Sequence, residues 1–108
     1  MSNKKFVSTM RKGFQITFAN GLTASVQWGA GNYCDNHFPE DFDFSFSKDA
    51  RSDTAEVAVI HKGELINFID EFIPEECSSD GTVAGWLSPE DVLYFLTKVS
   101  EYKSASEV

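Results

Sequence analysis

Two short segments that alternate apolar and polar residues flank the dipeptide Asn20-Gly21, and this pattern constrains the fold more than any other. The apolar members are Phe14, Ile16 and Phe18 before the dipeptide, and Leu22, Ala24, Val26 and Trp28 after it. Alternation with period two is typical of half-buried strands. Asn-Gly between two such runs is a strong hairpin signal. The sequence therefore predicts an antiparallel hairpin over residues 14–28.

The apolar pattern also predicts the loop of this hairpin. A two-residue Asn20-Gly21 loop would pair Phe18 with Thr23, which puts the apolar residues of the two strands on opposite faces. A three-residue loop with Gly21 in a left-handed bulge pairs Phe18 with Leu22 and places all of them on one face. We therefore expect the bulged loop, with Ile16 opposite Ala24 and Phe14 opposite Val26.

A second hairpin is expected around Lys62-Gly63. The strand 54–61 carries apolar residues on both faces, and the segment 64–69 returns from the turn. A two-residue loop would pair Val59 with Ile66 and Val57 with Phe68. Strands that are apolar on both faces are buried on both sides, so this hairpin is predicted to be central in the sheet.

The remaining segments predict one helix and several irregular stretches. Ser88-Pro89 followed by two carboxylates is a helix start with a cap, and apolar residues then recur at helical spacing to Tyr102. Phe42, Phe44 and Phe46 alternate with polar residues and predict part of a strand. Residues 70–82 are acidic and rich in turn-forming residues, and residues 1–11 either fray or add a short edge strand through Phe6-Val7.

These expectations combine into an α+β fold: an antiparallel sheet of four to five strands with one C-terminal helix packed on a face. At 108 residues the chain is expected to be a single domain over 1–108, with 1–11 and 103–108 frayed. Aromatic residues make up 14% of the chain, so there is enough apolar volume for one core.

Charge is the clearest signal in the composition. The formal net charge is −8, and every acidic residue lies at or after Asp35. Such a chain repels phosphate backbones, so direct nucleic-acid binding is not expected. No apolar run is long enough to cross a membrane, and the start lacks the apolar core of a signal peptide. We therefore expect a cytoplasmic protein, in the host cell, with Cys34 and Cys77 as reduced thiols.

The segment from Trp28 to His37 is the candidate site. Gly29 and Gly31 permit close approach of the backbone, Asn32 tolerates a left-handed conformation, and Tyr33 offers a flat ring with a polar tip. Polar side chains then follow in succession up to Asn36 and His37. Loops of this composition on a rigid scaffold commonly carry binding groups, although a polar turn at the end of a strand is an equally good interpretation.

Catalytic and metal chemistry is weakly supported. Cys34 and His37 have the right types for a thiolate and its base, or for part of a zinc site with His61 and Cys77. The surrounding acids would raise the pKa of the Cys34 thiol, and the distant pair has no spacing signature. Neither a calcium loop, a P-loop nor a dinucleotide fingerprint is present. We expect no enzyme, no cofactor and no metal, although a backbone nest at the glycines could hold one anion.

A resemblance is carried by three stretches of the sequence. The run 20–34, which includes the Gly-x-Gly-Asn-Tyr-Cys segment at 29–34, is followed by Ala55-Glu56-Val57-Ala58-Val59 and by Trp86-Leu87-Ser88-Pro89-Glu90. Over residues 14–100 the chain resembles a widespread group of small bacteriophage-encoded proteins, most of which have no assigned function. The resemblance implies a phage accessory protein and transfers no catalytic residue.

Two functional hypotheses follow. In the first, a non-enzymatic homo-oligomer sequesters a nucleotide-type host defence signal: an aromatic residue stacks on the base, Gly31 and Asn32 contact the ligand, and Arg51 or Lys48 meets phosphate. The expected ligand-binding residues are Trp28, Gly29, Gly31, Asn32, Tyr33, Asn36, His37, Arg51 and Trp86. In the alternative, an acidic surface inhibits a host defence protein or a nucleic-acid-binding protein. The residues expected on that surface are Asp35, Glu40, Asp41, Asp43, Glu75 and Glu76.

Overall fold

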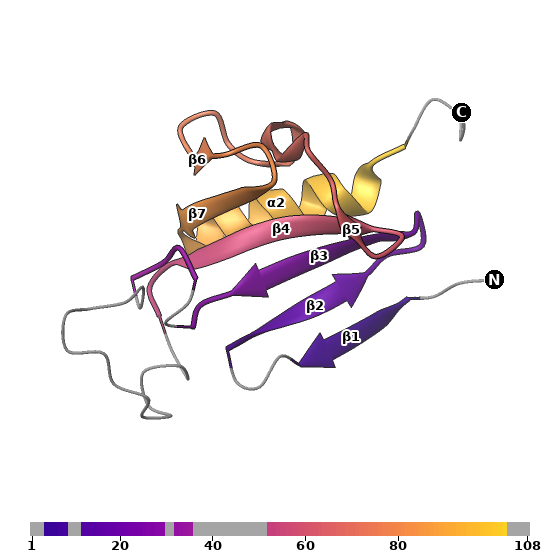
Figure 1. Cartoon of the computed structure of the whole chain (residues 1–108), viewed down its shortest axis with the longest axis horizontal. Helices are drawn as coiled ribbons and strands as arrows, with labels where there is room; N and C mark the ends of the chain where they lie inside the picture. Colours follow the sequence, from indigo (N-terminus) through magenta and orange to yellow (C-terminus); the bar gives the residue numbers. More distant parts are fainter. Residues whose placement is uncertain (1–3, 9–11, 30–31, 36–51, 104–108) are drawn as a thin grey trace.

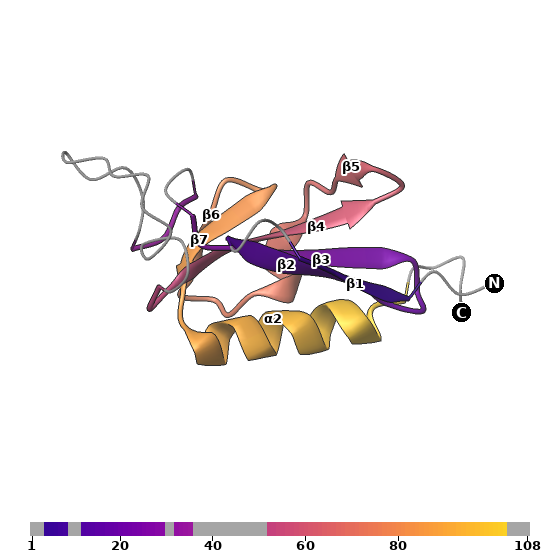
Figure 2. The same cartoon turned by 90° about the horizontal axis from the view of Figure 1, so that it is seen from below.

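The computed structural model describes residues 4–8, 12–29, 32–35 and 52–103, and these form an α+β fold (Figure 1). The strands form one antiparallel sheet in the order β1-β2-β3-β4-β7-β6. Strand β5 pairs with the end of β4, on the same edge of β4 that pairs with β7. Helix α2 runs along one face of this sheet (Figure 2). The predicted fold class and the C-terminal helix are confirmed. The sheet has more strands than the four to five expected, because β6 (Ser78–Ser79) and β7 (Val83–Leu87) were not predicted. The predicted return strand over 64–69 is present only as the short strand β5 (Glu64–Leu65).

The hairpin of β2 (Gly13–Thr17) and β3 (Leu22–Gln27) has the predicted bulged loop. Phe14 lies opposite Val26 and Ile16 opposite Ala24. The Phe18 N–H donates to the Leu22 carbonyl over 2.9 Å, and Gly21 has φ +88°, where a side chain would be strained. The need to keep one apolar face therefore selected the correct register.

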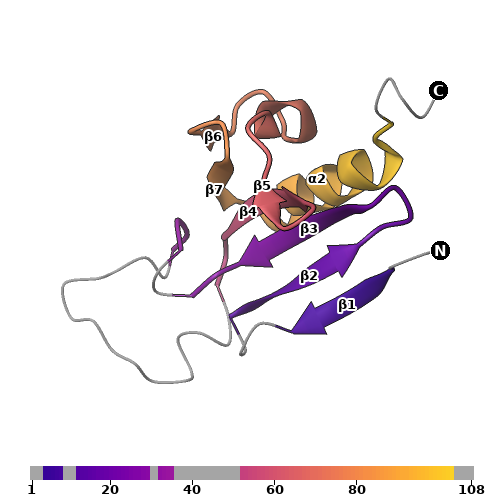
Figure 3. The ribbon, with the colours of Figure 1, turned by 45° about the vertical axis from the view of Figure 1, so that its right-hand side comes forward.

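Strand β1 (Lys5–Ser8) pairs with β2 and forms an edge of the sheet (Figure 3). Part of the lead-in segment thus forms the edge strand rather than fraying. Within the described residues no strand pairs with the outer side of β1, and Phe6 on this strand is 82% exposed.

Strand β4 (Ala55–His61) is central, as its two apolar faces predicted, but its partner differs from the expected one. The turn at Lys62-Gly63 pairs Ile60 with Leu65, and the Ile66 N–H still donates to the Val59 carbonyl. The expected pairing of Val57 with Phe68 is wrong, because Val57 pairs with Ala84 of β7 (Val83–Leu87). The chain leaves the sheet after Leu65.

The segment that leaves the sheet forms the 3-10 helix η1 (Ile69–Phe72), which buries Ile69 and Phe72 against the core. Its apolar residues therefore reach the core without extending β5. The apolar residues of this segment are compatible with either conformation, and the pairing of β7 with β4 decides between them.

Helix α2 (Pro89–Glu101) begins at a capping box. The Ser88 hydroxyl accepts a hydrogen bond from the Asp91 N–H over 3.1 Å, and the Asp91 carboxylate accepts one from the Ser88 N–H over 3.3 Å. Phe95 and Val99 are fully buried against β3, β4 and η1. The predicted cap is confirmed, and the helix ends one residue before the expected Tyr102.

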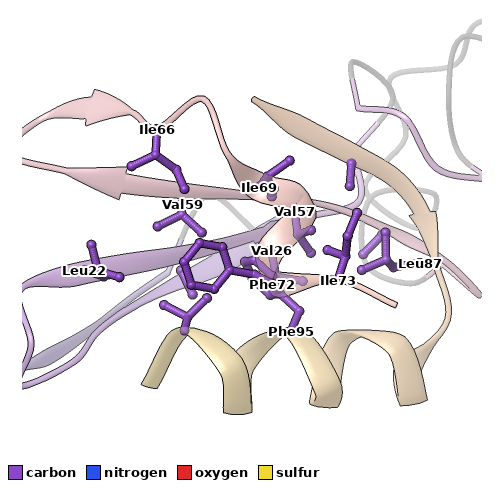
Figure 4. Close-up of a cluster of buried hydrophobic side chains, with 14 residues drawn as sticks. Leu22, Val26, Val57, Val59, Ile66, Ile69, Phe72, Ile73, Leu87 and Phe95 are labelled. Atoms are coloured by element: carbon purple, nitrogen blue, oxygen red, sulfur yellow. The ribbon is translucent and has the colours of Figure 1, made fainter. Parts of the chain in front are cut away.

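The core lies between α2 and the sheet (Figure 4). Its largest fully buried side chains are Phe72, Phe95, Ile69, Leu87, Val26, Val57, Val59 and Val99. In the part of the chain that the structure describes, no helix is long and apolar enough to cross a membrane. The predicted strand through Phe42–Phe46 lies outside the described residues.

Candidate functional site

The described part of the Trp28–His37 corner is a tight turn held by Asn32. The Asn32 side-chain oxygen accepts a hydrogen bond from the Gly29 N–H over 2.9 Å, and the Asn32 N–H donates to the Gly29 carbonyl over 3.0 Å. The Cys34 N–H then donates to the Asn32 carbonyl. Asn32 therefore bonds both the N–H and the carbonyl of Gly29, which explains the short polar residue at this position.

Glu56 of the neighbouring strand β4 accepts hydrogen bonds from two further donors of the corner. The Glu56 carboxylate accepts hydrogen bonds from the Asn32 side-chain amide over 3.0 Å and from the Tyr33 N–H over 3.1 Å. The Asp35 N–H donates to the Thr54 hydroxyl over 2.9 Å. One side-chain amide and one backbone N–H of the corner therefore bind a carboxylate, and this carboxylate is the chain's own Glu56.

A β-bulge faces Glu56 on the other side of the strand. Ala55 pairs with Leu87 and Val57 with Ala84, so the two residues Gly85 and Trp86 lie opposite the single residue Glu56. Trp86 has φ +55°, which is uncommon for a residue with a large side chain. A bulge re-aims side chains, and here Ala84 and Leu87 are both buried whereas Trp86 is 52% exposed.

The re-aimed Trp86 ring packs against Tyr33. The two ring centroids are 5.7 Å apart at an interplanar angle of 37°, and the Trp86 N–H donates to the Tyr33 carbonyl over 2.8 Å. A Cβ at Gly85 would lie 2.6 Å from the Tyr33 Cβ, so only glycine allows this approach. Tyr33 is 45% exposed. The corner and the bulge together therefore present a fixed aromatic pair at the surface.

A surface pocket of about 260 Å³ lies beside this pair. It is lined by Tyr33, Ser78, Ser79, Asp80, Val83, Gly85 and Trp86. We call it the aromatic pocket. Its lining includes two aromatic rings, the Ser78 hydroxyl and the Asp80 carboxylate, whereas the Ser79 hydroxyl donates to the Asp70 carboxylate. This lining suits a flat ring with hydrogen-bonding groups at its edge.

The Asp80 carboxylate is fixed by its own turn. It accepts hydrogen bonds of 2.9 Å from the N–H groups of Val83 and Thr82 and from the Thr82 hydroxyl. These bonds, with the Val83 N–H the largest cause, lower the pKa of Asp80 below its ordinary value. The side chain is exposed and remains a charged acceptor at neutral pH.

The structure brings together only part of the predicted ligand-binding set. Tyr33 and Trp86 share the aromatic pocket. Trp28 instead packs edge-on against Phe14, with centroids 6.2 Å apart, and lines a separate cavity of about 240 Å³ near the start of α2. The predicted residues Gly31, Asn36, His37 and Arg51, with Lys48, lie outside the described residues.

Of the predicted acidic surface, Asp35, Glu75 and Glu76 are exposed, and Glu40, Asp41 and Asp43 lie outside the described residues. Glu75 and Glu76 follow η1 in the segment that leads to β6 and so to the wall of the aromatic pocket. The acidic segment 70–80 and the aromatic pair are therefore neighbours.

The thiols are poorly suited to chemistry. Cys34 is 1% exposed, and its Sγ points to the Gly29 carbonyl at 3.6 Å. Burial, with Asp91 and Glu76 nearby, raises the pKa of the Cys77 thiol to about 11. No group of three potential metal ligands gathers among the described residues, and His61 lies at the opposite end of β4 from the corner.

Sequence reasoning missed the residues that build this site around the two rings. Gly85 and Glu56 had no distinguishing signal, because a bulge arises from the pairing of two strands. Ser78, Ser79 and Asp80 were treated only as part of an acidic turn.

Comparison with profiles of known protein families, with curated proteins and with solved structures finds no match to this chain.

Proposed function

We propose that the chain is a non-enzymatic phage accessory protein that sequesters a nucleotide-type host defence signal in the host cytoplasm, with the base of the signal at the aromatic pocket. The observation that carries the proposal is the bulge at Gly85-Trp86, which turns a large aromatic ring out of the sheet and sets it beside Tyr33. Exposing a tryptophan in a positive-φ conformation opposes folding, and such features gather at functional sites.

Stacking supplies the affinity in this proposal. A base stacked on an aromatic side chain contributes about 1–3 kcal/mol, and every base has a ring face to offer. The pocket volume of about 260 Å³ lies below the range of about 300–1,000 Å³ of complete small-molecule sites. It therefore has room for one ring rather than for a whole nucleotide, and a second subunit would complete the enclosure.

The charge of the pocket orients the ligand. Asp80 is the one ionised group in its described lining, and no described lysine or arginine lines it. A carboxylate accepts hydrogen bonds from the exocyclic amino group of a base but repels phosphate. The amino edge of the base therefore faces Asp80, and the phosphates point away from the pocket.

Isothermal titration with cyclic dinucleotides and ADP-ribose derivatives tests this proposal. Tyr33→Ala and Trp86→Ala should each weaken binding by about 5- to 150-fold, as expected for one lost stacking contact. Tyr94→Ala is a matched control, because Tyr94 is similarly exposed (42%) but lies on α2. Flat titrations with every ligand, for a folded protein, would exclude the nucleotide.

The acidic segment supports a second candidate function. Asp70, Glu71, Glu75, Glu76 and Asp80 are all exposed within one short segment beside the aromatic pocket. Carboxylates next to exposed rings suit a basic protein surface, since lysine and arginine form ion pairs with carboxylates and pack over aromatic rings. In this reading the chain occupies a basic groove of a host defence or nucleic-acid-binding protein.

A lysine- and arginine-rich peptide distinguishes the second candidate from the first. Its affinity should fall steeply between 50 and 300 mM salt (an order-of-magnitude change) because exposed charges are screened, and it should fall further in a Glu75→Gln/Glu76→Gln variant. Glu101→Gln, at the end of α2, is the control. Binding that ignores both salt and the double variant would exclude this candidate.

We also propose that the protein is a homo-oligomer. Strand β1 is an open edge within the described sheet, and Phe6 on it is 82% exposed. Unprotected edges with apolar side chains are where strands of another chain add. Two copies that join through β1 would bury Phe6 against its counterpart.

A further inference from the structure

A third pocket, of about 580 Å³, lies at the end of the sheet that holds the β2–β3 loop and the β4–β5 turn. It is lined by Lys4, Lys5, Thr17, Gly21, Thr23, His61 and Lys62. We call it the lysine pocket. None of these residues belongs to the site described above.

The strand register builds the floor of the lysine pocket. Lys5 lies opposite Thr17, and Thr17 lies opposite Thr23, so the three side chains form one row across β1, β2 and β3. Leu22 and Ala24, which flank Thr23, are buried against α2, so the row lies on the other face of the sheet. His61 and Lys62 enter from the end of β4 and its turn.

The floor is polar and partly preorganised. Thr17 is 92% buried, being 8% exposed, and its hydroxyl lies 2.8 Å from the Thr23 hydroxyl. One hydroxyl hydrogen serves this bond, so the second is left for a further acceptor. The space over Gly21 is open, because an added Cβ there meets nothing within 4 Å.

The charge of this pocket is opposite to that of the chain. Three of the nine lysines and arginines line it in a protein of net charge −8. Glu64 of β5 lies opposite His61 of β4 across the turn, and Glu64 does not line the pocket. Within the described residues Lys5 and Lys62 form no ion pair. Three ammonium groups around two hydroxyls are donors that match the oxygens of a phosphate.

We propose that the lysine pocket binds a phosphate-bearing anion. The site is separate from the aromatic pocket: β4 runs from Ala55, paired with Leu87, to His61, paired with Leu22. Six residues of strand span about 20 Å, so occupation of one pocket requires no ligand in the other. Of the described acidic residues, Asp80 lines the aromatic pocket and none lines the lysine pocket, which leaves the lysine pocket open to anions.

Pyrophosphate is the probe that tests this site. Titration of the full chain, followed by the backbone amide signals in NMR, should shift Thr17, Thr23 and Lys62 saturably, and inorganic phosphate should bind more weakly. Lys5→Gln/Lys62→Gln should weaken pyrophosphate binding roughly tenfold, as two exposed charge pairs allow. Lys98→Gln, on α2, should change it less than about twofold on the same scale.

Two further measurements identify the source of the phosphate and check that the variant is folded. ADP that shifts the same amides shows that a nucleotide phosphate is accepted, and ADP that does not shift them restricts the site to free phosphates. Circular dichroism checks that the double variant is folded. The proposal is overturned if pyrophosphate shifts none of these amides, or if Lys98→Gln weakens binding as much as the double variant. A flat nucleotide titration at the aromatic pocket would leave this result unaffected.

Discussion

Replacement of Glu56 by glutamine removes the charge on which the corner depends while keeping the shape of the side chain. In the native chain both carboxylate oxygens accept hydrogen bonds, one from the Asn32 amide and one from the Tyr33 N–H. Glutamine keeps one acceptor oxygen and places an amino group against the other donor. Hydrogen bonds to charged groups contribute about 1.5–3 kcal/mol, and water can replace the exposed bond to Tyr33, so the loss should lie near the lower end.

Glu56→Gln should therefore lower the free energy of unfolding by about 1.5 kcal/mol, close to a tenfold change in the folding equilibrium. With a slope of roughly 1.5 kcal/mol/M for a chain of this size, the urea midpoint should fall by about 1 M. Because Glu56 fixes Tyr33 beside Trp86, ligand binding at the aromatic pocket should weaken as well.

Glu64→Gln is the matched control for this measurement. Glu64 also lies on a strand and is exposed, and its side chain forms no hydrogen bond within the described residues, so its replacement should change stability by less than about 0.5 kcal/mol. If the two variants unfold at the same urea concentration, Glu56 does not hold the corner, and the reasoning about its donors is wrong.

Other predictions concern the helix, the thiol and the edge strand. Ser88→Ala should lower stability by about 1 kcal/mol through the lost cap, seen by urea unfolding, whereas Ser100→Ala on the exposed side of α2 should have little effect. Folding raises the pKa of the Cys77 thiol from 9.0 to about 11, so at pH 8 the folded protein has roughly 100-fold less Cys77 thiolate than the unfolded chain. Iodoacetamide should therefore react slowly with Cys77 in the folded protein and at the ordinary rate in urea. Since the unfolded thiol ionises first, Cys77 stabilises the fold fully below pH 9, and this contribution falls as the pH rises toward 11. Phe6→Lys should shift the mass measured by light scattering toward the monomer, and an unchanged mass would contradict association through β1.

The elements with a strong local pattern could be predicted from the sequence. The register of the β2–β3 hairpin followed from keeping Phe14, Phe18 and Val26 on one face, and the start of α2 followed from the cap at Ser88. Both depend on neighbours in sequence. The residue opposite Val57 could not be predicted in this way, because an apolar strand accepts either a continuation of β5 or a different strand there, and β7 takes that position.

The candidate site was predictable only in its chemistry. Tyr33 and Trp86 attracted attention as exposed-ring candidates, but the sequence gives no distance between them. Their meeting depends on a bulge in which two residues of β7 oppose one residue of β4. The donors of the corner looked available for a ligand until pairing placed Glu56 beside them. A charge that strand pairing brings in from another part of the chain cannot be predicted from the residues adjacent in sequence.

The indole N–H signals in a ¹H–¹⁵N NMR titration with cyclic dinucleotides and ADP-ribose derivatives test the role of the bulge most directly. The chain has two tryptophans, so Trp86→Phe assigns both signals. The Trp86 signal should shift saturably with the amides of Tyr33 and Gly85, while the Trp28 signal, from a ring packed on Phe14, stays in place. A saturable ligand that moves Trp28 and leaves Trp86 unchanged would contradict the claim that the bulge presents the binding ring.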